Sequence, residues 1–249
     1  DEARAEWPQE AALGQTRFLA GLVELHAHHL LHDFETSKHE FIGEHGDSPS
    51  LLVQGPPGTG KSYTAAFALF ARMQGAMAAG RPFRAQVTCK THRATDVLLE
   101  NVLRVRNKLA DIAAAHPDLF DAHFDRRLLN APLLRLAGKE ASPDGVVALA
   151  KDADKEKGAR KNWDILHDAS WEVIAATPGG VYRLVKDRKG GLFVHHSIDC
   201  LVLDEASQMN LPEAAMAALP LKPNGQLIVV GNHRQMPPII HHDWANAPR

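Results

Sequence analysis

The chain has little of what marks secreted, membrane-spanning or disulfide-stapled proteins. Cysteine occurs only twice in 249 residues, at Cys89 and Cys200, so a disulfide framework is excluded and the reducing cytoplasm is the expected location. No apolar run approaches the ~20 residues of a membrane helix, and the opening residues DEARAE are unlike a signal peptide. The formal net charge is only −2, so contacts to nucleic acid would need a local basic track.

The composition is that of a globular protein. Hydrophobic residues make up 45% of the chain and charged residues 23%, which suits one large domain or two small ones. There is no internal repeat. The chain lacks a starting Met and ends shortly after the third motif described below, so we expect it to be part of a longer protein.

The strongest motif is at residues 51–62, which read LLVQGPPGTGKS. They contain the spacing G-x-x-x-x-G-K-S of a phosphate-binding loop, between an apolar run and a predicted helix over residues 63–73. Glycines let the backbone aim N–H groups at phosphate oxygens, and the start of a helix adds its positive end. The predicted nucleotide-binding residues are Gly55, Pro56, Pro57, Gly58, Thr59, Gly60, Lys61, Ser62 and Tyr63.

Two side chains of this loop have specific predicted roles. Lys61 would supply a full charge to the β- and γ-phosphates, and the Ser62 hydroxyl would ligate Mg²⁺. The alternative is a Gly/Pro-rich turn between a strand and a helix. The flanking apolar run and helix favour the nucleotide site.

A second motif follows about 140 residues later, at residues 198–208, IDCLVLDEASQ. An apolar strand that ends in acids places carboxylates at the ligand-binding edge of an α/β sheet. Asp204 would hold Mg²⁺ opposite Ser62, and Glu205 would act as general base on the attacking water. Alone, such a run is as consistent with acids on the surface, but the phosphate-binding loop upstream favours the metal and base roles.

A third motif is LIVVGNHRQMPP at residues 227–238. Here a predicted buried strand ends in a Gly turn, and Gln235 follows where it could sense the γ-phosphate. Without the other motifs, this stretch would be only a strand followed by a Pro-rich loop.

Strands and helices are predicted to alternate, which favours an α/β fold built on a parallel sheet with crossover helices. The predicted strands are residues 51–53, 83–89, 171–177, 198–203 and 226–230. The predicted helices are residues 9–32, 63–79, 91–105, 181–185 and 211–219.

The chain is expected to consist of an N-terminal segment and a core domain with an insertion. Residues 1–50 are expected to form a helix and a loop (36–50) that lead into the core domain, residues 51–249. The first helix should bury one apolar face, formed by Leu13, Leu19, Leu22, Val23, His26, His29 and Leu30. Residues 106–163 are expected to be a mainly helical insertion, with helical pieces at 109–115 and 126–136. Its mixed-charge run at 151–161 is either a solvated surface segment or a lobe that faces nucleic acid.

Histidines gather at the end of the first predicted helix. His28 and His32 are one helical turn apart, but no Cys or clustered acid lies beside them, and the sequence H-E-x-x-H is absent. We interpret them as ordinary helix surface and expect no metal there.

Taken together, these motifs resemble motifs I, II and III of superfamily 1 helicases, in the order found in that family. The sequence is most similar to superfamily 1B, which includes the RNA helicase of nonsense-mediated decay and nuclease-helicases that process DNA ends. Residues 87–94, VTCKTHRA, resemble motif Ia, and residues 175–180, AATPGG, resemble a second strand-contacting element. The resemblance covers about residues 51–110 and 171–240.

The resemblance implies a RecA-like P-loop NTPase domain with helices on both faces of its sheet. It implies ATP and Mg²⁺ as cofactors, and ATP hydrolysis coupled to stepping along single-stranded DNA or RNA, usually 5′ to 3′. Lys61, Glu205 and Gln235 match the family's catalytic residues, and Ser62 and Asp204 its metal ligands. Thr91 and Thr177 match strand-contacting positions. No membrane partner is implied.

The family also implies partners beyond this chain. A second RecA-like domain would supply arginine fingers, worth roughly 10³ to 10⁵ in rate in related sites, and some relatives carry a nuclease domain. We therefore expect this chain alone to bind ATP with Mg²⁺ but to hydrolyse it feebly.

Some positions depart from the family. Asn232 stands where the family usually has Asp, and Met236 where it has Leu. The adenine-contacting Gln of the family has only Gln15 as a candidate, unusually far upstream of the loop. Two alternatives therefore stay open: a P-loop ATPase that remodels a defence or repair complex without unwinding, and a scaffold with weak catalysis. The intact Lys61, Asp204 and Glu205 argue against the scaffold.

Overall fold

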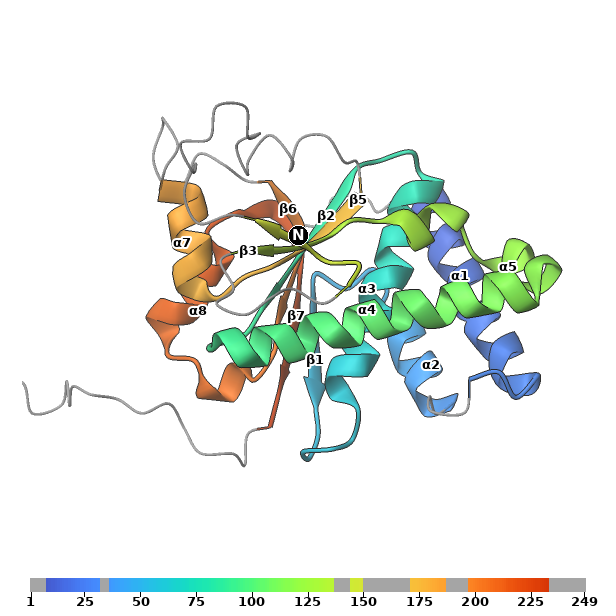
Figure 1. The fold of residues 1–249 in the computed structure, drawn as a ribbon, viewed down its shortest axis with the longest axis horizontal. Coiled ribbons are helices and arrows are strands. Elements are labelled where there is room, and N and C mark those ends of the chain that lie inside the picture. The colour runs from blue at the N-terminus through green and yellow to red at the C-terminus, as the bar shows by residue number, and fades with distance from the viewer. Residues whose placement is uncertain (1–7, 32–35, 137–143, 150–170, 187–196, 233–249) are drawn as a thin grey trace, which may run out of the picture.

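The computed structural model describes residues 8–31, 36–136, 144–149, 171–186 and 197–232 (Figure 1). Its centre is a seven-stranded sheet in the order β1-β7-β6-β2-β5-β3-β4, in which every pair of neighbours is parallel. This confirms the predicted α/β fold. The strands are β1 (Ser50–Gln54), β2 (Phe83–Thr88), β3 (Leu133–Leu136), β4 (Val147–Leu149), β5 (Trp171–Ala175), β6 (Ile198–Leu203) and β7 (Leu221–Gly231).

Helices cover both faces of the sheet (Figure 1). The cores show that α3 and α4 pack on one face, with α1, α2 and α5 around them, while α7 and α8 pack on the other. None of the described helices is long and apolar enough to cross a membrane. The helices are α1 (Gln9–Ala27), α2 (Thr36–Glu44), α3 (Lys61–Ala78), α4 (His92–Ala115), α5 (Pro117–His123), α7 (Pro178–Lys186) and α8 (Leu211–Ala218), with short 3₁₀ turns η1 (Arg126–Asn130) and η2 (Ala206–Gln208).

The strands are apolar because both of their faces are buried, as parallel sheets require. In β6, Cys200 and Val202 belong to the core under α3 and α4. Leu201 and Leu203, which alternate with them, pack with α8. This period of two explains why the strands read as continuous apolar runs in the sequence.

Local signals set the ends of the main helices. Thr91 caps the start of α4 by accepting a hydrogen bond from the Ala94 N–H at 3.2 Å. Asn210 and Glu213 form a capping box at the start of α8. After α3, Gly80 adopts φ +64°, a left-handed conformation that ends a helix and that glycine accepts without strain.

The prediction for the N-terminal region is partly wrong. The segment expected to be a loop contains α2, because its buried Ile42 gives a helix a core contact. Helix α1 forms but ends at Ala27, before the predicted end at residue 32. Of its predicted buried face, Leu13 and Val23 are 62% and 52% exposed, and His26 and His29 are also exposed. The buried face is offset toward Gly14 and Gly21, since glycine lets α1 approach its neighbours closely.

The segment expected to be a mainly helical insertion contains part of the sheet. Helix α4 continues unbroken to Ala115, and Pro132 separates η1 from β3 where a helix over 126–136 was expected. Strand β3 pairs with β5 and β4 with β3, because Leu133 and Leu134 are both buried, on opposite faces. The charged run at 151–161 lies outside the described residues.

Candidate nucleotide-binding site

The phosphate-binding loop connects the end of β1 to the start of α3, as the motif predicts. Gly58 and Gly60 adopt φ +80° and +74°, values that residues with a side chain rarely take. Thr59 Oγ1 donates to the Pro56 carbonyl at 2.9 Å and closes the turn. The N–H groups at the start of α3 have no partner within the helix, so the loop is built to accept an anion.

Lys61 is the first residue of α3 and folds back over the loop. Its Nζ donates to the Pro56 carbonyl at 2.9 Å, so the ammonium lies at the concave side of the turn. A phosphate that entered the loop could take over this hydrogen bond, because the ammonium has three donors and a flexible stem.

Ser62 and Asp204 meet at the carboxyl edge of the sheet. Ser62 Oγ donates to Asp204 Oδ2 at 2.5 Å. Strand β7 lies between β1 and β6, so the loops after β1 and β6 leave the sheet at the same edge. Asp204 is 5% exposed; burial raises the pKa of its carboxyl, and hydrogen bonds from Ser62 and from the Glu205 N–H oppose that rise.

This pair fits Mg²⁺, which prefers hard oxygen ligands. Within the described residues, no group of three or more His, Cys, Asp or Glu side chains is placed to hold a metal ion. Ser62 and Asp204 would therefore bind Mg²⁺ together with phosphate oxygens and water, as is usual for this ion beside a nucleotide.

Glu205 follows in a strained conformation. Its φ is +52°, a region that is unfavourable for residues other than glycine and is found at functional sites. Its N–H donates to Asp204 Oδ1 at 2.8 Å, and its Oε2 accepts from Gln208 Nε2 at 3.0 Å. Glu205 lines the same hollow as Lys61.

The hollow over the loop has a volume of about 380 Å³. Most of its lining comes from the predicted residues, but Asn101 and Arg104 of α4 also line it. No motif predicts these two residues, because they lie in α4 beyond the motif at residues 87–94 that includes the start of this helix. They lie one helical turn apart, so a single face of α4 forms this wall.

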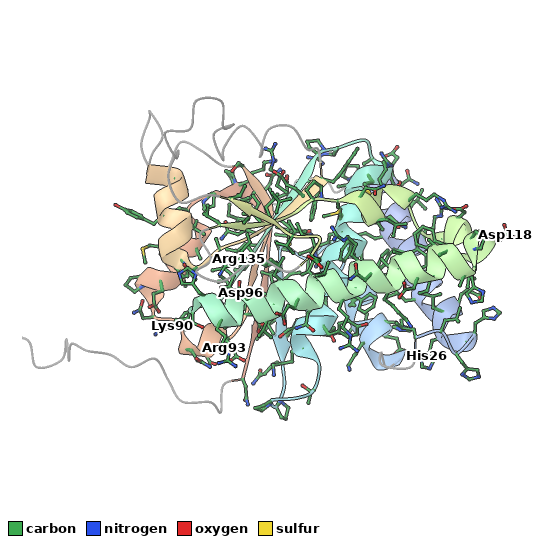
Figure 2. All side chains as sticks on the ribbon, in the orientation of Figure 1. His26, Lys90, Arg93, Asp96, Asp118 and Arg135 are labelled. Atoms are coloured by element: carbon green, nitrogen blue, oxygen red, sulfur yellow. The ribbon has the colours of Figure 1, made fainter. Side chains whose placement is uncertain are left out.

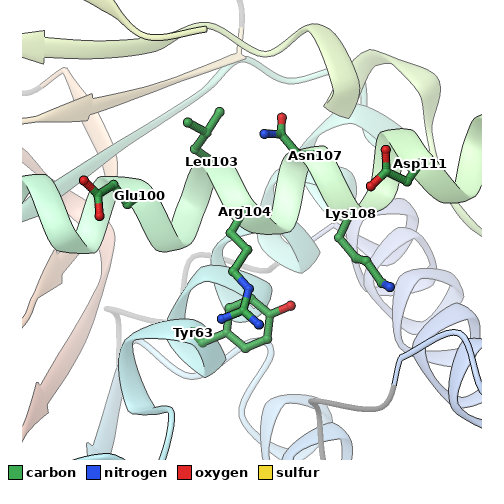
Figure 3. Close-up of a pocket in the computed structure, with 7 residues that line it drawn as sticks. All are labelled: Tyr63, Glu100, Leu103, Arg104, Asn107, Lys108 and Asp111. Carbon is green, nitrogen blue, oxygen red and sulfur yellow. The ribbon is translucent and has the colours of Figure 1, made fainter. Parts of the chain in front are cut away.

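Arg104 also lines a neighbouring hollow of about 430 Å³ along α4. Figure 3 shows its guanidinium over the ring of Tyr63, 4.6 Å from the ring centroid. Tyr63, predicted to bind nucleotide, is thus stacked at the junction of the two hollows.

Gln15 lies far from the loop. It is buried, and its Nε2 donates to the Gly46 carbonyl at 3.3 Å. Its Cγ lies against Gly75 of α3, 2.8 Å from where a Cβ on Gly75 would be. Gly75 is 75 − 61 = 14 positions after Lys61, or about 20 Å along a helix axis. Helix α2 brings Lys38 near the loop. The Nζ of Lys38 is 3.5 Å from where a Cβ on Gly60 would be.

The predicted strand-contacting residues cap helices at the same sheet edge. Thr91 caps α4, and Thr177 Oγ1 accepts from the Gly180 N–H at 3.3 Å at the start of α7. Thr91 is exposed, whereas Thr177 is 8% exposed. Gln235 lies outside the described residues, and Asn232 is the last residue before that segment.

A buried cation that no sequence motif predicts binds the first residues of α4. Arg135 of β3 is 2% exposed and pairs with Asp96. It also donates to the His92 carbonyl at 3.3 Å. Figure 2 labels Arg135 and Asp96 at this end of α4. The ion pair fixes the helix that begins with the predicted strand-contacting loop.

Comparison with known proteins agrees with this geometry. A family model described as an AAA domain matches residues 38–241, which includes the phosphate-binding loop, Asp204 and Glu205. A search of curated proteins found no match. The chain therefore belongs to the AAA domain family and is a P-loop NTPase domain of the ATPase type.

Proposed function

We propose that this domain is the ATP-hydrolysing motor domain of a superfamily 1B helicase or translocase that acts on single-stranded nucleic acid. The observation that carries the proposal is the contact between Ser62 and Asp204, with Glu205 beside it. It brings the phosphate-binding loop and the two acids into one site, as hydrolysis requires.

The residues would divide the work of hydrolysis. The N–H groups of the loop and Lys61 bind and orient the phosphates. Ser62 and Asp204 hold Mg²⁺, which neutralises charge on the β- and γ-phosphates when it is bound. Glu205 accepts the proton of the attacking water, because a carboxylate has about four acceptor sites. It can therefore bind this water while its Oε2 still accepts from Gln208 Nε2.

The nucleic-acid side of the proposal rests on the loops after β2 and β5. These strands are neighbours in the sheet, and each is followed by a helix that begins with a predicted strand-contacting threonine, Thr91 or Thr177. A sugar–phosphate backbone that crosses this edge would meet two helix starts in succession. Such contacts are independent of base sequence, so DNA and RNA are both candidate substrates.

The proposal also includes parts that the resemblance implies. Gln235 would sense the γ-phosphate, and a second RecA-like domain would supply arginine fingers to the ATP site. A nuclease domain would be an additional partner. On this proposal, the domain alone binds ATP with Mg²⁺ and hydrolyses it slowly.

Steady-state ATP hydrolysis by the full-length protein tests the proposal. Saturating single-stranded DNA or RNA should raise the rate many-fold, and added salt should reduce that effect by weakening phosphate contacts. Hydrolysis that responds to neither nucleic acid would overturn the helicase and translocase proposal and favour a remodelling ATPase. Binding of nucleic acid without any hydrolysis would favour a scaffold.

A further inference from the structure

One lysine joins the loop after β2 to the segment that carries Glu205. Lys90 Nζ donates to the main-chain carbonyl of Gln208 at 3.0 Å and lies 3.4 Å from Glu213 Oε2. Lys90 immediately precedes Thr91, the predicted strand-contacting residue. Figure 2 labels Lys90 beside the first turn of α4. A single side chain therefore connects the proposed nucleic-acid edge with the catalytic segment.

The first contact leads directly to Glu205. Gln208, whose carbonyl Lys90 binds, donates from Nε2 to Glu205 Oε2 at 3.0 Å. The Gln208 N–H donates to the Glu205 carbonyl at 2.9 Å. Because Glu205 has a φ of +52°, its surroundings must hold it in place. A shift of Lys90 would therefore move Gln208, and with it the carboxylate of Glu205.

The second contact fixes the far end of the same segment. Glu213 Oε2 accepts from the Asn210 N–H at 3.0 Å, and Asn210 Oδ1 accepts from the Glu213 N–H at 2.9 Å. This capping box begins α8. The side chains of Lys90 and Glu213 are only 29% and 24% exposed, so solvent screens their attraction less than that of a fully exposed pair. Lys90 thus braces residues 205–213 at two points.

We propose that Lys90 is a positioning residue that couples strand binding at the loop between β2 and α4 to the orientation of Glu205. This inference rests on the proposed function and names how nucleic acid would regulate the ATP site. A phosphate bound at the start of α4 pulls on the loop, and Lys90 passes the displacement to Gln208 and Glu205. Lys90 is not among the residues that line the hollow over the phosphate-binding loop.

The test compares charge removal at two ion-paired cations in the full-length protein. Lys90→Met removes the ammonium and keeps the apolar stem, and Lys90→Arg keeps a cation. Arg126→Met is the matched control, since Arg126 also pairs with a carboxylate, that of Asp121, and, in the described part of the chain, has no hydrogen bond or ion pair to residues 205–213. Hydrolysis is measured at saturating ATP and saturating single strand, and nucleotide affinity by titration.

Lys90→Met should lower the strand-stimulated kcat at least fivefold, with the Kd for nucleotide within twofold of wild type. Lys90→Arg should recover most of that loss, and Arg126→Met should keep the wild-type kcat. An unchanged stimulated kcat in Lys90→Met overturns the proposal. An equal loss of kcat and nucleotide affinity also overturns it, because general damage to the site would lower both.

One further readout, the basal kcat, and one further variant keep the test decisive. If wild type is not stimulated by DNA or RNA, the proposed function fails by itself. The basal kcat then decides the role of Lys90: a fivefold loss at unchanged nucleotide Kd supports positioning of Glu205, and no loss refutes it. If Lys90→Met does not fold, Lys90→Gln replaces it with the same expected results.

Discussion

Ser62 Oγ donates a hydrogen bond to Asp204 Oδ2 across 2.5 Å, although 142 positions separate the two residues in the chain. The contact exists because β1 and β6 run in the same direction on either side of β7. It joins the phosphate-binding loop to the acids after β6, so both motifs belong to one site. The same pair carries the proposed Mg²⁺ site.

Replacing Asp204 should therefore change the response to Mg²⁺. Asp204→Asn keeps the size of the side chain but removes its charge, so the Mg²⁺ concentration for half-maximal hydrolysis should rise at least tenfold. Asp199→Asn is the matched control, because Asp199 lies near the other end of β6 and binds Arg84 and Lys222. A Mg²⁺ titration of hydrolysis by both variants checks this. Equal Mg²⁺ dependence in Asp204→Asn and wild type would remove Asp204 from the metal site.

The free energy of unfolding should depend on pH through Glu172. This residue lies near the start of β5, at the end of the strands opposite the ATP site. The residue is 0% exposed. Its Oε1 accepts from Arg84 Nε at 2.6 Å, and among the described residues its Oε2 has no hydrogen-bond partner. Burial raises its pKa from 4.5 to about 7, against the opposing effect of Arg84.

The sign follows from proton binding. Between pH 4.5 and 7, the folded protein keeps a proton on Glu172 that the unfolded chain has released. The free energy of unfolding should therefore fall as the pH rises through this window, by roughly 3 kcal/mol for the full shift. In Glu172→Gln this contribution should be absent. Denaturant unfolding at several pH values measures the difference, and parallel pH profiles for the two proteins would show that Glu172 is not the cause.

Close packing of α1 on α3 should make Gly14 intolerant of a side chain. A Cβ at Gly14 would lie 2.7 Å from Ala78 Cβ and 3.0 Å from the Gln74 carbonyl. Gly14→Ala should cost about 1–3 kcal/mol and lower the Tm by about 2–12 °C. Gly179→Ala in α7 is the control, since a Cβ there would have no described atom within 4 Å. Thermal melts that do not separate the two variants would contradict the predicted clash.

Local patterns were sufficient to predict the alternation of strands and helices and the phosphate-binding loop. Apolar runs identify buried parallel strands, and the G-x-x-x-x-G-K-S spacing identifies the loop, because each reflects interactions among residues close in sequence. Ser62 and Asp204, which we expected to hold Mg²⁺ opposite each other, are in direct contact. This expectation needed only the rule that parallel strands end at a common edge.

The errors arose where tertiary contacts decide the structure. Helix α2 owes its stability to the burial of Ile42, and the inward face of α1 follows from where Gly14 and Gly21 meet their neighbours. Strands β3 and β4 are short, and their pairing is visible only in the assembled sheet. Sequence periodicity does not encode such long-range contacts.

Two contacts near the candidate site were likewise not predictable from local sequence patterns. Arg104 reaches the hollow from α4, and Lys90 reaches Gln208 across 118 positions. Arg104 lies outside every motif, and the motif at residues 87–94, which includes Lys90, does not indicate a contact with Gln208. Both became candidates only once the sheet placed α4 and the loop after β2 beside the two main motifs.

Substitutions of Lys61 and Glu205 should separate nucleotide binding from ATP hydrolysis. Lys61→Ala should weaken nucleotide binding strongly, because it removes the cation at the phosphate-binding loop. Glu205→Gln keeps the shape of the side chain and one acceptor oxygen for Gln208 but removes the proposed base. It should bind nucleotide like wild type and lose turnover by at least a hundredfold.

The most direct test of the account is single-turnover hydrolysis of ATP by the full-length Glu205→Gln protein, with bound nucleotide measured in the same samples. The account predicts that ATP binds with wild-type affinity and stays intact over the time in which wild type completes its turnover. Cleavage of the bound ATP at the wild-type rate would contradict the assignment of Glu205 as the base.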